Sequence, residues 1–213
     1  MFIPLYENQL YYSKIYLSLR GLNLIMERYE FFKQFHDISI TDYHLLTDCL
    51  KTRSFKKGDF ITVPGQIQRE LYFVKSGVQM SYFDTGDKIY TLAFTYFPHL
   101  CAIAESFSFQ VPSKYFLVCL TDSELEYITH DTLQKLVDQS QQIERLFRRM
   151  TEAMFANMID LHIELRALTI EERYKTFCRK SSHLLQLVPH KYIASYLGID
   201  PTNFSRLFNK VKF

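Results

Sequence analysis

The sequence predicts an α+β fold in which an antiparallel β domain is followed by one long helix and a small helical domain. Between residues 52 and 129, short β-rich runs alternate with turn residues. After His130 the apolar residues recur every three or four positions, as in helices. The last 25 residues have the pattern of two short helices joined by a tight turn. Hydrophobic residues make up 47% of the 213-residue chain and charged residues 23%, a composition that excludes a disordered protein.

The beginning of the chain is open to two interpretations. Residues 1–26 are apolar and rich in tyrosine, but charged residues interrupt them, which argues against a signal peptide. Because Met26 begins a more usual start, residues 1–25 are either an N-terminal extension or the product of an upstream start codon. Residues 27–35 have a short helical pattern, and a second helix is predicted to follow with Thr41 as its N-cap.

The β region consists of short runs of strand-forming residues. Each run is bounded by turn residues, and four of the six glycines of the chain fall at these turns. The spacing of the runs is typical of an all-β sandwich or barrel, here predicted as a double-stranded β-helix, or jelly roll. The predicted strands are residues 54–55, 60–63, 71–74, 78–83, 89–94, 115–120 and 124–128.

A short helix over residues 131–138 and a long helix over residues 142–167 follow the β region. An apolar stripe runs along the long helix at spacings of three and four. The stripe could lie on its own β domain, but a helix of this length spans about 39 Å, more than a small barrel covers. We therefore predict that the stripe is a dimer interface. Its residues are Ile143, Phe147, Met150, Met154, Met158, Leu161 and Leu165.

The long helix is predicted to end at a capping box, in which a hydroxyl residue is followed three positions later by glutamate. Thr169 and Glu172 form this pair. The box defines the last of four predicted segments, because it starts a new helix. The segments are residues 1–26, a β domain at 27–140, a dimerisation helix at 141–168 and a helical domain at 169–213.

The helical domain contains the pattern of a helix-turn-helix. Gly198 supplies the tight turn, Ile199 fills the angle between the helices, and Asp200 caps a second helix with Pro201 at its first position. Phe204, Leu207 and Phe208 are predicted to face inward. The opposite face is polar, and with two flanking lysines it supplies the candidate DNA-binding residues. These are Lys191, Thr202, Asn203, Ser205, Arg206 and Lys210.

The charge distribution also points to nucleic acid. Residues 173–213 contain eight Lys or Arg residues and one acidic residue, Asp200, whereas the rest of the chain carries a net charge of −5. A basic end on a mildly acidic body is typical of a module that binds the phosphate backbone. A helical hairpin without a nucleic-acid role is the simpler alternative, but it does not account for this charge.

The order of these parts resembles the Crp/Fnr family of bacterial transcription regulators. The resemblance covers residues 27–213 and is carried by four segments: 55–59, 71–77, 172–174 and 193–199 followed by Ser205 and Arg206. It implies a cyclic-nucleotide-binding-like sensor domain, a homodimer held by the long helix, and double-stranded DNA as a partner. RNA polymerase is a further partner that the resemblance implies.

The sensor region departs from the cyclic-nucleotide-binding pattern of the family. That pattern has a Phe-Gly-Glu segment and a later arginine that neutralises the cyclic phosphate. Here the stretch lacks glycine, and Pro112 stands where the arginine is expected, so cyclic AMP is an improbable effector. Any effector pocket is expected to be apolar or collapsed. Its candidate residues are Phe97, Ile103, Glu105, Ser106, Phe107 and Ser113.

Several other classes of protein are not supported. The four cysteines are scattered without C-x-x-C spacing, so no metal site, iron–sulfur cluster or other cofactor is predicted. No catalytic motif is present, and no apolar run reaches the roughly 20 residues of a membrane span. We expect a cytoplasmic, homodimeric DNA-binding regulator rather than an enzyme. The alternative is a small-ligand- or protein-binding module with a degenerate sensor and weak DNA binding.

Overall fold

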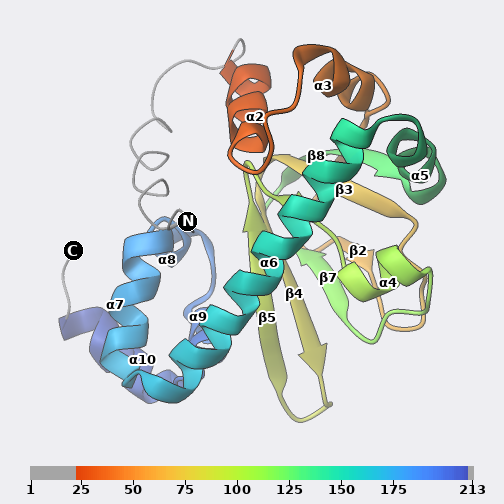
Figure 1. Cartoon of the computed structure of the whole chain (residues 1–213). Coiled ribbons are helices and arrows are strands. Elements are labelled where there is room, and N and C mark those ends of the chain that lie inside the picture. The colour runs from red at the N-terminus through yellow and green to blue at the C-terminus, as the bar shows by residue number, and fades with distance from the viewer. Residues whose placement is uncertain (1–22, 211–213) are drawn as a thin grey trace.

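The structure is a computed structural model that describes residues 23–210 and combines helices with antiparallel sheets, as predicted (Figure 1). Two helices precede the sheets: α2 (Asn23–Lys33) and α3 (Ile40–Thr47). Residues 1–22 of the predicted extension lie outside the described residues, whereas α2 begins within the range assigned to the extension.

The N-cap predicted for α3 was wrong by two residues. The hydroxyl oxygen of Ser39, not of Thr41, accepts a hydrogen bond from the backbone N–H of Asp42 at 3.0 Å. Both positions carry a hydroxyl, and the one that keeps extended backbone, with ψ at 154°, is the cap.

Two four-stranded antiparallel sheets face each other in the β domain. One has the order β1-β8-β3-β6 and the other the order β2-β7-β4-β5, so all paired neighbours except β4 and β5 come from distant parts of the chain. This arrangement is consistent with a jelly roll. The strands are β1 (Lys51–Phe55), β2 (Phe60–Thr62), β3 (Glu70–Ser76), β4 (Val78–Asp84), β5 (Ile89–Tyr96), β6 (Leu100–Cys101), β7 (Phe116–Cys119) and β8 (Ser123–Thr129).

Gly77 shows why the turn between β3 and β4 needs glycine. Its φ is +89°, and a Cβ atom there would lie 2.6 Å from the carbonyl oxygen of Asp122 and 2.2 Å from the hydroxyl of Ser123. The first contact is with backbone, which has no side-chain rotamer to relieve it. Gly77 therefore lets β3 turn into β4 directly against the start of β8.

Three apolar clusters hold the parts together. The space between the sheets is filled by side chains such as Tyr72, Val74 and Leu125. Leu71 and Phe73 point out of the same β3 strand and pack beneath α2, α3, α5 (His130–Gln139) and the start of α6 (Gln141–Ala167). Because side chains on both faces of β3 are buried, the strand is apolar at four consecutive positions, from Leu71 to Val74.

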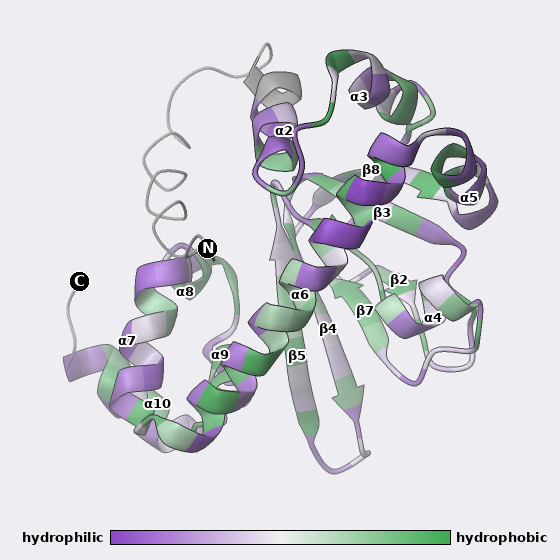
Figure 2. Cartoon of the chain, viewed as in Figure 1, coloured by the Kyte–Doolittle hydropathy of each residue, from purple (hydrophilic) through white to green (hydrophobic). Residues whose placement is uncertain are grey.

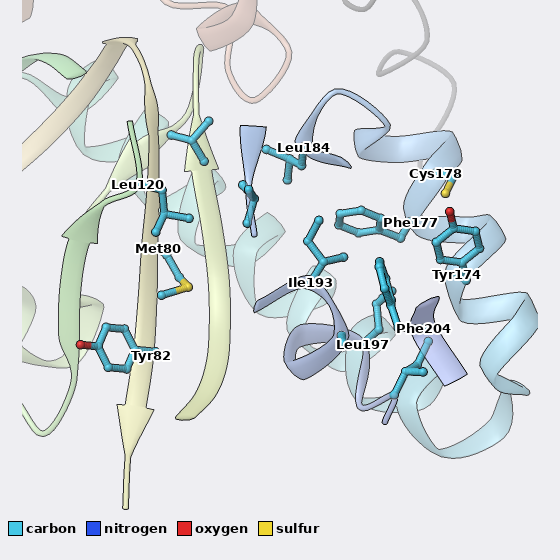
Figure 3. Packing of buried hydrophobic residues seen from close by; sticks show 14 of the residues in the cluster. Met80, Tyr82, Leu120, Tyr174, Phe177, Cys178, Leu184, Ile193, Leu197 and Phe204 are labelled. Atoms are coloured by element: carbon cyan, nitrogen blue, oxygen red, sulfur yellow. The ribbon is translucent and has the colours of Figure 1, made fainter. Parts of the chain in front are cut away.

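The third cluster joins the β domain to the C-terminal helices. Those helices are α7 (Ile170–Ser181), α8 (Leu184–Leu187), α9 (His190–Leu197) and α10 (Pro201–Lys210). Figure 3 shows Met80 of β4 and Leu120, which directly follows β7, on the side of the sheet that faces Ile193 and Phe177. The C-terminal helices therefore pack on the outer face of the second sheet.

Candidate nucleic-acid interface

The turn between α9 and α10 has the predicted geometry. Gly198 is left-handed, with φ at 60°, and its backbone N–H bonds to the carbonyls at the end of α9. Ile199 is buried in the angle between the helices. The carboxylate of Asp200 accepts the backbone N–H of Thr202 at 2.8 Å and so caps α10.

The buried face of α10 fixes which side chains point outward. Phe204 and Leu207 pack against Ala194 and Ile193 of α9 and are 1% and 8% exposed. Phe208 was predicted to face inward, but it is 38% exposed, and its ring packs against that of His190. The buried face is therefore narrower than predicted. Phe208 directly follows Leu207, and consecutive residues lie about 100° apart around a helix axis.

Opposite this buried face, α10 presents a row of polar side chains. Thr202, Ser205, Arg206 and Lys210 are exposed, and Asn203 is half-buried. Within the part of the chain that the structure describes, no carboxylate pairs with Arg206. Its guanidinium is therefore available for a bidentate contact of the kind that reads guanine in a major groove.

The remaining basic residues of the C-terminal helices divide into two groups. Lys175 pairs with Glu171 at 2.7 Å and Lys180 with Glu164 at 2.9 Å, so local acids partly neutralise both. The pKa of Glu171 is lowered, first by its hydrogen bond with Lys175 and further by the charge of Lys210. Lys191 is exposed at the start of α9, with its ammonium over the Tyr192 ring. Lys191, Arg206 and Lys210 are thus exposed and have no carboxylate partner within residues 23–210.

The predicted dimer stripe on α6 separates into a covered part and an uncovered part. Ile143 is fully buried in its own β domain, and Phe147 and Met150 pack partly against the same cluster, so Ile143 has no surface left for a second chain. Met154 and Met158 are 45% and 61% exposed. Leu161 is half-buried and Leu165 is 36% exposed, so the open stripe lies along the second half of the helix.

Sequence reasoning missed a second apolar row on the same half of α6. Phe155, Ile159 and Ile163 follow each other at spacings of four and are 64%, 45% and 53% exposed. Figure 2 shows hydrophobic residues gathered along this half of α6, beside α9. The spacing was a signal that could have identified the row. A helix that lies outside a core but is apolar on two faces is expected to be buried between other elements.

The candidate effector residues do not share one cavity. Phe97 and Ile103 are buried between the sheets, whereas the ring of Phe107 packs on the other side, 5.4 Å from His130. Glu105 is exposed in the first turn of α4 (Ala104–Phe109), where the ammonium of Lys114 lies 3.4 Å from its carboxylate.

The two serines of the predicted pocket are already used by the chain. Ser106 is completely buried, accepts the backbone N–H of Gln68 at 2.9 Å and donates to the carbonyl of Val111 at 2.7 Å. Ser113 donates to the carbonyl of Tyr115 and accepts its N–H. Neither hydroxyl is therefore oriented toward a ligand.

An open hollow lies instead beside the loop before β3. It has a volume of about 570 Å³ and contains none of the six predicted residues. Glu70 and Tyr72 line it: the guanidinium of Arg53 donates to both carboxylate oxygens of Glu70, at 2.6 and 2.8 Å, and the Tyr72 hydroxyl donates to the same carboxylate. Burial alone would raise the pKa of Glu70, but these two partners lower it overall. The lining is Ile61, Thr62, Gly65, Gln66, Ile67, Gln68, Arg69, Glu70 and Tyr72.

The described residues contain no group of three histidine, cysteine or acidic side chains placed to hold a metal ion. Burial raises the pKa of the Cys101 thiol to about 12 and that of Cys119 to about 11, which keeps both protonated. Over residues 23–210, none of the helices combines the length and apolarity needed to cross a bilayer.

Comparison with known proteins identifies the fold. No family model matches the chain, and no curated protein matches its sequence. Among solved structures, FixK2 from Bradyrhizobium japonicum is 19% identical with a TM-score of 0.67, and the match covers 76% of this chain and 83% of FixK2. A Crp/Fnr-family protein from Eubacterium rectale is also 19% identical, with a TM-score of 0.62 and coverage of 83% and 84%. The chain has the Crp/Fnr fold.

Proteins with the Crp/Fnr fold differ in what they sense. CLP from Xanthomonas campestris, a c-di-GMP-responsive global regulator, is 17% identical with a TM-score of 0.58, and the match covers 81% of this chain and 91% of CLP. Fold alone therefore assigns no effector to this chain.

Proposed function

We propose that the chain is a DNA-binding transcription regulator that acts in the cytoplasm as a homodimer. The observation that carries the proposal is the outward face of α10, where Arg206 is exposed without a carboxylate partner among the described residues. The helix is fixed from behind by Phe204 and Leu207 and at its start by Asp200. A rigid helix with a short polar face and a free guanidinium suits the major groove.

The homodimer follows from the uncovered half of α6. Met154, Met158 and Leu165 remain exposed after the chain has folded, and a row of Phe155, Ile159 and Ile163 lies beside them. Burying six such side chains against a second copy would remove a large apolar patch from water. Two chains joined along α6 would present two copies of α10 to the half-sites of a palindromic operator.

For the sensor, we propose a domain that does not respond to cyclic AMP. Pro112 forms a β-bridge with Ile67, and the nearby Ser106 and Ser113 hydroxyls are bonded within the chain. Lys114, two residues after Pro112 along the chain, is exposed and pairs with Glu105. A cyclic phosphate placed there would lose its water without gaining a buried cation.

The proposal is tested by selecting DNA sequences that the wild-type chain binds and then measuring affinities at fixed salt. Arg206→Ala should weaken binding to the selected sequence by about 1–3 kcal/mol relative to a scrambled duplex. Arg179→Ala is the matched control, because Arg179 is exposed on α7 and the one bond of its guanidinium within residues 23–210 is to Thr176 of the same helix. An equal ratio of specific to scrambled affinity in wild type and Arg206→Ala would contradict the role of α10.

A further inference from the structure

Arg173 connects two helices that meet at the junction between α6 and the C-terminal helices. It lies in the first turns of α7. One guanidinium nitrogen donates to the carbonyl of Leu165 at 2.7 Å and the other to the carbonyl of Gly198 at 3.3 Å. No carboxylate pairs with Arg173 within residues 23–210, so both of its observed partners are main-chain oxygens.

The two carbonyls share an electrostatic property. Leu165 lies in the last turn of α6, and Gly198 is the C-cap of α9. Carbonyls at a helix C-terminus lack partners within the helix and carry the negative end of the helix dipole. A planar cation between two such ends therefore stabilises their close approach and satisfies a free carbonyl at each end.

The helices are in contact at this point, so the arginine joins two packed elements. A Cβ atom on Gly198 would lie 3.5 Å from a methyl group of Leu165, an ordinary van der Waals distance. The turn that Gly198 forms leads directly into α10. The contact that sets the position of α10 relative to α6 therefore lies next to Arg173 in space.

We propose that Arg173 is a positioning residue that holds the helix-turn-helix at one angle to α6. In a dimer joined through α6, this angle sets the separation and rotation of the two α10 helices. The consequence for DNA rests on the proposed function. One added base pair between half-sites rotates them by roughly 35°, so a fixed angle should select one half-site spacing.

The guanidinium fork is needed for this role. Two carbonyls on different helices must be reached by separate N–H groups, which a single lysine ammonium on a flexible stem does not present in a fixed geometry. Arg179 carries the same charge on the same helix, but among the described residues its guanidinium bonds to Thr176 of α7 alone. Replacing Arg179 therefore removes a charge without removing a link between helices.

The first measurement does not need DNA. Spin labels are placed on cysteines introduced at Ala156 of α6 and Ser205 of α10, both exposed, with Cys49 replaced by serine and excess unlabelled protein added. Pulsed electron resonance then gives the distance distribution between the labels. Arg173→Met should broaden or shift the distribution, whereas Arg179→Met should leave it as in the wild type. Identical distributions in the two variants would overturn the proposal.

The second measurement uses the selected palindrome with one base pair inserted or removed at its centre. Wild type and Arg179→Met should bind the selected spacing at least about tenfold more tightly than the altered spacings. Arg173→Met should lose most of this preference while remaining dimeric in sedimentation. If Arg173→Met does not fold, Arg173→Lys should show the same changes. Wild type that binds no DNA would contradict the proposed function, whereas the label distances would still decide the role of Arg173.

Discussion

The contact of Ser195 with β5 gives a prediction about how the C-terminal helices are held on the β domain. β5 is an edge strand, and the Ser195 hydroxyl of α9 donates to the carbonyl of Ile89 at 2.9 Å and accepts the N–H of Thr91 at 3.0 Å. The hydroxyl therefore supplies the donor and the acceptor that the backbone of a further strand would supply at this edge. Tyr196 adds a ring contact with Phe94 of the same strand.

The cost of removing the hydroxyl follows from the burial of its partners. Thr91 is 7% exposed, so its N–H would lose its acceptor in a site that water reaches poorly. An unsatisfied buried donor costs about 1–3 kcal/mol. Ile89 is half-buried and its carbonyl can reach water more easily. We therefore expect Ser195→Ala to lower the free energy of unfolding by about 2 kcal/mol, which is roughly 4–8 °C in Tm for a chain of this size.

Urea unfolding followed by circular dichroism measures this change. Ser205→Ala is the matched control, because Ser205 is exposed on α10 and its replacement should change the free energy of unfolding by less than about 0.5 kcal/mol. Equal midpoints for Ser195→Ala and Ser205→Ala would show that the hydroxyl does not hold the C-terminal helices on β5.

Three further predictions concern the dimer, the effector and pH. Glutamate at both Met154 and Leu161 should give monomers in sedimentation equilibrium, because the charges would face each other in an apolar interface; an intact dimer would refute that geometry. Cyclic AMP should bind in the millimolar range or weaker by isothermal titration, since Pro112 supplies no cation; a Kd at or below about 10 μM would contradict this. Burial lowers the pKa of His99 in the folded chain. As the pH falls, His99 is therefore protonated in the unfolded chain, near pH 6.5, before it is protonated in the folded chain. The free energy of unfolding should therefore decrease as the pH falls below about 6.5, and His99→Gln should flatten this decrease in urea titrations at several pH values.

The parts of the fold that depend on local chemistry could be predicted from the sequence. The turn at Gly198 and the cap at Asp200 need only neighbouring residues, and the capping box formed by Thr169 and Glu172 is present with both reciprocal bonds. The long helix was predicted within one residue of its observed start, because its apolar spacing continues from Ile143 to Leu165.

The parts that depend on distant residues could not be predicted. Ser195 meets β5 more than 100 residues away in sequence, and no pattern in either segment announces the contact. Ile143 was assigned to a dimer stripe because periodicity shows which residues share a face but not which element covers that face. In the same way, the candidate pocket residues were grouped by sequence, although successive side chains around α4 point to different clusters.

The central claim is that the outward face of α10 reads DNA, and binding to the selected palindrome as a function of salt tests it most directly. We predict that the dimer binds this duplex far more tightly than a scrambled one, with log affinity falling linearly as log salt rises. Arg206→Ala should remove most of the preference for the selected sequence and leave the affinity for scrambled DNA nearly unchanged. Equal affinity of the wild-type chain for both duplexes at every salt concentration would contradict the account.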